Sequence, residues 1–151
     1  MNTYAELEKL CLNIIHSDNL IAHKMQQLCN LLDAKLETYD WTGFYSADEE
    51  NKTLLLGPYK GEPTSHTSIP FGKGICGQAA ESKKTFLIDN VSEQSNYISC
   101  SIHVKSEVVV PILKHGLVVG QIDVDSHTPA AFSKKDQDLL EHICSELAPY
   151  F

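Results

Sequence analysis

Apolar residues recur at helical spacing over the first third of the chain, from Tyr4 to about Leu36. A stripe repeating every three to four residues is typical of an amphipathic helix with one buried face. The polar stretch "HSDN" interrupts the stripe, and Ser17 or Asp18 is a suitable N-cap for a second helix. The pattern therefore predicts two helices at the start of the chain.

The middle of the chain has the shorter period of β-strands. Two strands are predicted at Trp41–Tyr45 and Thr53–Gly57, joined by the polar turn "ADEENK". The segment "GKGICGQAAESKK" predicts a short helix from about Gly74 to Ser82. An irregular loop is expected from Asp89 to about Ser101.

The last third predicts a hairpin followed by a helix. The stretch "SEVVVPILKHGLVVGQIDVDS" is rich in β-branched residues and is divided by "LKHG". Ser133, with Asp136 three residues later, is the N-cap of a closing helix that continues to Leu147. These elements predict an α+β fold, in which terminal helices cover one face of an antiparallel sheet and the other face is free to form a small-molecule pocket.

Length and charge narrow the function classes. The 151 residues suit one domain spanning 1–151, and no apolar run reaches the roughly 18 residues that a membrane span needs. The net charge of −8 and the lack of a Lys/Arg-rich run disfavour nucleic acid and anionic membranes as partners. The N-terminus "MNTYAELEKL" does not resemble a signal peptide, so a cytoplasmic location is expected.

Three carboxylates are predicted to share one face of the hairpin. Alternation in "QIDVDS" places Asp123 and Asp125 on the face opposite Ile122, and one register of the hairpin would set Glu107 directly across from Asp123. Like charges at such positions destabilise a sheet. The face is therefore either solvated or a pocket for a cationic group such as an α-ammonium, in which one carboxyl could act as a general acid.

The five cysteines are too few and too irregularly spaced for a secreted disulfide framework. Cys11, Cys29 and Cys144 occupy helical apolar positions and are expected in the core. Cys76 lies near a predicted helix start, where backbone dipoles favour a thiolate, and Cys100 lies in a polar segment near a histidine and a lysine. Either of these two thiols could react.

Two other kinds of site are disfavoured. "GKGICG" matches a phosphate-binding glycine pattern, but Pro70 interrupts the strand that should precede it. A zinc site made of Cys76, Cys100, His66 and His103 would lack a C-x-x-C pair, so no metal is expected and the two histidines are interpreted as surface residues.

The motifs "WTGFY", "LLLGPYKGEP", "IPFGKGICGQAA", "SCS...SEVVVPI" and "VVGQIDVDS" occur in one order from about Trp41 to Phe132. In that order the chain resembles the free methionine-(R)-sulfoxide reductases, a family built on a single GAF domain. The resemblance implies reduction of free methionine-(R)-sulfoxide by cysteine chemistry. It also implies an enzyme disulfide that thioredoxin reduces, no bound cofactor, and a homodimer.

The resemblance also implies roles for individual residues. Cys100, after "YIS", matches the family's nucleophile, and Cys76 matches a cysteine able to resolve the resulting sulfenic acid as a disulfide. The remaining matches are acidic residues for the substrate's ammonium group and for protonation of the sulfoxide oxygen, and an aromatic wall around its methyl group. The acidic residues are Glu107, Asp123 and Asp125, and the aromatic residues are Trp41 and Tyr45.

The chain departs from the family's pattern in two places. The family usually carries a third cysteine shortly after its "GPFxG" segment, whereas "GPYKGEPTSHTSIP" contains none and places His66 there. Tyr97 and Ser101 stand where a histidine and an aspartate are common. Three hypotheses therefore stay open: a functioning reductase, a non-catalytic GAF module that binds a small metabolite, and an interaction protein whose helices pair two GAF domains.

Overall fold

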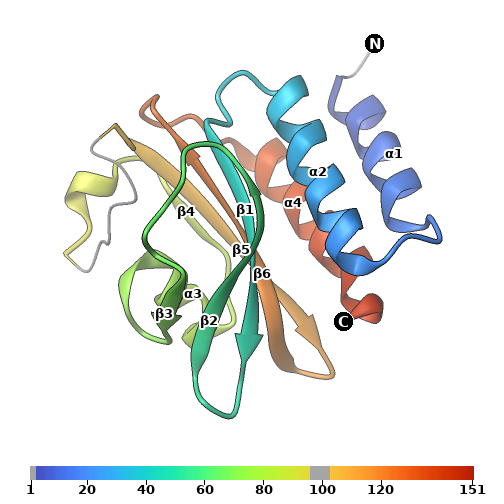
Figure 1. Ribbon diagram of the computed structural model, residues 1–151. Helices are drawn as coiled ribbons and strands as arrows, with labels where there is room; N and C mark the ends of the chain where they lie inside the picture. The colour runs from blue at the N-terminus through green and yellow to red at the C-terminus, as the bar shows by residue number, and fades with distance from the viewer. Residues whose placement is uncertain (1–2, 96–102) are drawn as a thin grey trace.

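A six-stranded antiparallel sheet organises the computed structural model, which describes residues 3–95 and 103–151 (Figure 1). The strands are ordered β3-β2-β1-β6-β5-β4. None of the helices in those two ranges is long and apolar enough to cross a membrane. The strands are β1 Trp41–Asp48, β2 Thr53–Lys60, β3 Ser68–Pro70, β4 Phe86–Ile88, β5 Ser106–Lys114 and β6 Leu117–Ser126. The helices are α1 Thr3–Ile15, α2 Ile21–Lys35, α3 Gly74–Ser82 and α4 Lys134–Leu147, with short 3₁₀ turns at Val91–Glu93 and Ala148–Tyr150.

The two faces of the sheet carry different layers. Helices α2 and α4 pack on one face with α1 outside them, against both helices, and α3 lies against the other face (Figure 1). The main core lies under the three terminal helices, where Phe44, Ile122 and Val124 are fully buried. The predicted α+β architecture is confirmed, including the face on which Ile122 and Val124 lie.

The helix ends test the capping predictions. Helix α4 begins with the predicted capping box, since the Ser133 side chain accepts from the backbone of Lys135 and the Asp136 carboxylate accepts from the Ser133 N–H at 2.8 Å. The predicted N-cap of α2 is wrong, because Leu20 occupies that position without a side-chain cap. Ser17 instead donates to the Ile14 carbonyl at 2.7 Å, so its hydroxyl serves the end of α1.

The strands of the first hairpin are longer than predicted, and two further strands were missed. β1 and β2 each extend three residues further, to Asp48 and Lys60. β3 and β4 have only three residues each and form the two edges of the sheet. Three residues are too few to show an alternating pattern, and Pro70 is tolerated because it ends an edge strand.

The β5–β6 hairpin has a different register from the one considered above. Glu107 pairs with Asp125, and Asp123 pairs with Val109, so the expected pairing of Glu107 with Asp123 is wrong by two residues. The register changes by one residue beside Ile112, where β6 holds Val119 as an extra residue. A shift of two residues leaves every side chain on its predicted face, so the three carboxylates still share one face.

Candidate functional site

Cross-strand pairing brings the acidic residues together on the face opposite the three terminal helices. Trp41 on β1 pairs with Asp125 on β6, which pairs in turn with Glu107 on β5. Asp123 lies two residues before Asp125 on β6 and pairs with Gly43 on one side and Val109 on the other. All three carboxylate residues are at most 5% exposed. The hypothesis of a solvated sheet face is therefore wrong, because these side chains are buried.

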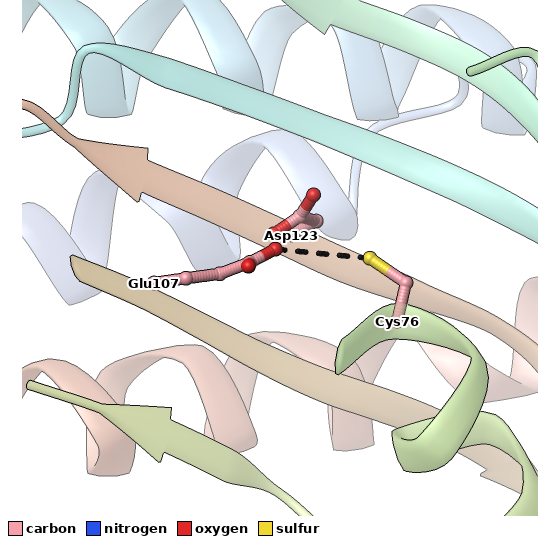
Figure 2. A group of neighbouring side chains, drawn as sticks. All are labelled: Cys76, Glu107 and Asp123. Carbon is pink, nitrogen blue, oxygen red and sulfur yellow. Dashed lines mark hydrogen bonds between the residues drawn. The ribbon is translucent and has the colours of Figure 1, made fainter. Parts of the chain in front are cut away.

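Helix α3 covers this row and brings a thiol to it. The Cys76 Sγ donates to Glu107 Oε2 at 3.8 Å, and ligand atoms of Cys76, Glu107 and Asp123 all lie within 4.8 Å of one another (Figure 2). Gly77 allows the helix to approach, since a Cβ atom there would lie 2.5 Å from the Pro70 carbonyl oxygen. The site is thus a buried thiol facing carboxylates from two strands.

The buried carboxylates lack enough hydrogen-bond donors. Both oxygens of Asp123 and Oδ1 of Asp125 make no hydrogen bond of ordinary geometry among the described residues, and the polar groups acting on Asp123 are members of the cluster itself, namely Cys76, Glu107 and Asp125. Burial, followed by the charges of Asp123 and Asp125, raises the pKa of Glu107 well above its ordinary value. Burial also raises the pKa of Asp123. The pKa of Asp125 is raised well above its ordinary value by burial and, next, by the charge of Asp123. Such a site favours protonated carboxyls when it is empty and gains free energy from a cation.

The same environment sets the state of the Cys76 thiol. Its position near the start of α3 suggested a stabilised thiolate. In the structure, the pKa of Cys76 is raised well above 9.0. Burial is the largest cause, and the charges of Asp123, Glu107 and Asp125 add to it. Desolvation and like charge outweigh the helix dipole here, so the thiol is protonated at neutral pH.

Aromatic side chains line the β1 side of the same face. The Trp41 indole stacks on Tyr59 with a centroid distance of 5.4 Å, and its Nε1 donates to the Glu62 carbonyl at 3.0 Å. The ring lies over Gly43, where a Cβ atom would be 2.3 Å from the indole. Tyr45 is 1% exposed and donates to the His66 carbonyl at 3.2 Å. The backbone glycine and the two hydrogen bonds fix both aromatic rings.

Most of the predicted site residues are on this face. Cys100, the predicted nucleophile, lies outside the described residues. Cys11, Cys29 and Cys144 are in the main core as predicted, and burial raises the pKa of Cys11 and of Cys29 to about 12. The face joins Cys76 to the predicted carboxylates and aromatics, which are Glu107, Asp123, Asp125, Trp41 and Tyr45.

The two histidines considered as zinc ligands have different surroundings. His66 is half-buried, and its backbone carbonyl supports Tyr45. His103 is exposed, as expected of a surface histidine, and its ring lies edge-on to that of His127, with 5.7 Å between the ring centroids.

Sequence reasoning missed two residues of the site. Gln121 is fully buried, and its Nε2 donates to the Cys76 carbonyl at 3.3 Å, so it ties α3 to the sheet. Its place two residues before Asp123 in the same alternation could have revealed it. Tyr59 pairs with Gly43 and supports Trp41, which required the register of the first hairpin.

Comparisons with known proteins agree with this architecture. A family model described as a GAF domain matches residues 23–150. The chain is 37% identical over 123 residues to GAF domain-containing protein A of Dictyostelium discoideum, covering 80% of this chain and 77% of that protein. It is 37% identical over 134 residues to free methionine-R-sulfoxide reductase of Saccharomyces cerevisiae, covering 87% of this chain and 69% of the yeast protein.

A solved structure extends the similarity to nearly the whole chain. The free methionine-R-sulfoxide reductase of Neisseria meningitidis, in complex with its substrate, superposes with a TM-score of 0.92. The two sequences are 29% identical, and the superposition covers 98% of this chain and 87% of the other.

Proposed function

The chain belongs to the GAF-domain family of free methionine-R-sulfoxide reductases, and from this premise we propose that it reduces free methionine-R-sulfoxide to methionine. The observation that carries the proposal is the buried group of three carboxylates with unpartnered oxygens. A desolvated anionic site of this kind is costly to fold unless a cation completes it. The α-ammonium group of a free amino acid offers one positive charge and three donors.

The geometry supports a division of labour in substrate binding. Glu107, Asp123 and Asp125 hold the ammonium group. Trp41 and Tyr45, on the neighbouring strand of the same face, enclose the methyl group beside the sulfoxide. A substrate held at both ends presents its sulfoxide in one orientation, which gives selectivity for one sulfur epimer.

The first chemical step uses Cys100 as the nucleophile. Its thiolate attacks the sulfoxide sulfur while the sulfoxide oxygen takes a proton from a carboxyl of the acidic group. The S–O bond of the substrate breaks, the oxygen passes to the cysteine sulfur, and methionine leaves. The raised pKa of Glu107 suits it to this acid role, because it keeps a proton available at neutral pH.

The second step regenerates Cys100 through Cys76. The Cys76 sulfur attacks the sulfenic acid, water leaves, and a disulfide forms. The Cys76 thiol must lose its proton in this step, and Glu107 Oε2, which already accepts its hydrogen bond at 3.8 Å, is the acceptor. Two electrons from the dithiol of thioredoxin then restore both thiols, so no bound cofactor is required. Disulfide formation needs the two Cα atoms within about 7 Å.

The cellular setting follows from the same proposal. A thioredoxin-dependent enzyme works in a reducing compartment, so we place the protein in the cytoplasm. We also propose a homodimer formed through the amphipathic N-terminal helices, where Leu10 on α1 and Leu20 at the N-cap of α2 are 43% and 74% exposed.

The test is NADPH oxidation coupled through thioredoxin reductase and thioredoxin, with the R and S epimers of free methionine sulfoxide supplied separately. We expect turnover of the R epimer only, and loss of turnover in Cys100→Ser. Cys29→Ala, which removes a buried thiol of α2 in the main core, is the matched control and should retain activity. Equal turnover of both epimers, or full activity in Cys100→Ser, would refute the proposal.

A second candidate function is a binding module that holds the same ligand without turnover. The observation in its favour is the lack of a cysteine between Gly57 and Pro70, where the family usually has one. This alternative predicts that methionine sulfoxide raises the melting temperature equally in the unsubstituted protein and in Cys100→Ser, with no NADPH consumed in either.

A further inference from the structure

Cys76, Glu107 and Asp123 together have the composition and spacing of a zinc site, and we propose that the reduced protein binds one Zn²⁺ ion there. Zinc binding at this place is a property beyond the reductase activity and needs no turnover. Its effect on catalysis rests on the proposed function.

The spacing of the ligand atoms is close to what zinc requires. Zn–S bonds of about 2.3 Å and Zn–O bonds of about 2.1 Å in tetrahedral geometry separate the sulfur from each oxygen by about 3.6 Å, and the two oxygens by about 3.4 Å. The Cys76 Sγ lies 3.8 Å from Glu107 Oε2, and no pair in the group is further apart than 4.8 Å. Side-chain movements of about 1 Å or less would close the tetrahedron.

The state of the ligand atoms points independently to a bound cation. Asp123 is 1% exposed and lies within the group, and among the described residues neither of its oxygens makes a hydrogen bond of ordinary geometry; the polar groups that act on it belong to the same cluster. An unpartnered buried carboxylate is costly unless a cation or a donor completes it. Glu107 has its thiol neighbour as a donor at 3.8 Å, a contact that metal binding would replace by two bonds to one ion.

The mixture of sulfur and oxygen ligands selects the metal. One thiolate with two carboxylates suits Zn²⁺, whereas Mg²⁺ and Ca²⁺ prefer oxygen ligands alone. Zinc binding would remove the proton from Cys76, since a coordinating thiol is deprotonated by the ion. Three protein ligands leave a fourth tetrahedral position for water.

Zinc in this place would inhibit the proposed reduction in two ways. The ion would occupy the acidic residues that hold the substrate's ammonium group. It would also keep the Cys76 sulfur from forming a disulfide with Cys100. Binding requires the reduced thiol, so zinc and the catalytic disulfide exclude each other.

The binding experiment uses the full chain, reduced and stripped of metal, without substrate. Zn²⁺ is titrated in competition with a chromogenic chelator, and Cd²⁺ is used separately because its thiolate complexes absorb in the near ultraviolet. We expect one ion per chain and a thiolate band with Cd²⁺. We expect Cys76→Ser to remove that band and to weaken zinc binding by more than about 100-fold, beyond the loss typical of changes outside a ligand set. Asp123→Asn, which keeps the thiol, is expected to weaken zinc binding as well. Millimolar Mg²⁺ should not compete.

Two control variants separate this site from other places. Cys29→Ala removes a different buried thiol and should bind zinc as tightly as the unsubstituted protein. His142→Gln disrupts a surface cluster in which His16 and His142 contact Glu146 at 3.2 and 3.3 Å. Zinc binding that persists in Cys76→Ser, or that is lost in His142→Gln, would overturn the proposal, as would no binding at all. Because substrate is absent, these results stand whether or not the protein proves to be a reductase.

Discussion

Replacing Asp123 by Asn should stabilise the protein while it removes activity. Asp123 is 1% exposed, and neither of its oxygens makes a hydrogen bond of ordinary geometry among the described residues; its polar neighbours are the Cys76 thiol and two further carboxyls. Leaving buried polar atoms unpaired typically costs about 1–3 kcal/mol, and an ionised oxygen costs more. An amide has no charge, and its two N–H groups can donate to the neighbouring carboxylates of Glu107 and Asp125. We therefore expect the free energy of unfolding at pH 7.5 to rise by about 2 kcal/mol. For a chain of this length that corresponds to an increase of roughly 4–8 °C in melting temperature.

The pH dependence gives this prediction a second signature. Burial raises the pKa of Asp123 above its ordinary value of 3.8, so the folded state holds its proton more tightly than the unfolded state does. Stability contributed in this way falls as the pH rises from the ordinary pKa through the raised one. The advantage of Asp123→Asn should therefore be large at pH 7.5 and shrink toward pH 4, where the carboxyl is protonated in both states.

Asp136→Asn is the matched control, since Asp136 is also buried, at 3% exposed. Its carboxylate accepts from the hydroxyls of Tyr4 and Tyr39, both at 2.9 Å, and from the backbone N–H of Ser133 at 2.8 Å. The same substitution there should lower the free energy of unfolding by about 1–3 kcal/mol. Both values come from urea unfolding followed by circular dichroism, with a chelator present to exclude metal. If Asp123→Asn destabilises the protein as much as Asp136→Asn does, the reasoning about unpaired carboxylates is refuted.

Three further predictions concern a helix cap, a surface histidine and the glycine under Trp41. Ser133→Ala should lower the free energy of unfolding by about 1 kcal/mol through loss of the helix cap, and an unchanged urea midpoint would contradict this. A side-chain hydrogen bond with Glu8 raises the pKa of His142, so its contribution to stability is complete below pH 6.5 and is lost as the pH rises through the raised value. His142→Gln should remove that part of the pH–stability curve, and a curve of unchanged shape would count against it. Gly43→Ala would place a Cβ atom 2.3 Å from the indole of Trp41, so it should displace the chain's one tryptophan and shift its fluorescence to the red; an unaltered spectrum would show that the ring had not moved.

Periodicity alone predicted the elements whose pattern is long. The alternation in "QIDVDS" placed Asp123 and Asp125 on one face, because a strand of ten residues repeats its pattern several times. The cap at Ser133 was also predicted, since its partner is only three residues away. The edge strands β3 and β4 were not, because their three residues are defined by pairing with distant segments.

The sequence predicted which residues form the site but not how deeply they are buried. Strand alternation predicted that the carboxylates share a face, whereas their burial depends on α3 lying over them. The state of Cys76 depends in the same way on long-range packing. A helix N-terminus favours a thiolate, but desolvation beside three carboxylates raises the pKa of Cys76 instead. Such balances are set by tertiary contacts, which local patterns do not contain.

The extra residue in β6 determines whether Glu107 lies on the same face of the sheet as Asp123 and Asp125. The turn at His115 and Gly116 begins with Lys114 opposite Leu117, a pairing that would, if continued, set Glu107 opposite Val124. Glu107 would then point into the dry core under the terminal helices, and Asp125 would stay on the other side. Val119 changes the phase of the strand by one residue and so unites the three carboxylates. The site thus depends on where β6 accommodates its extra residue: a regular hairpin of the same sequence, with Val119 paired in the ladder, would keep every acidic residue and place Glu107 and Asp125 on opposite faces of the sheet.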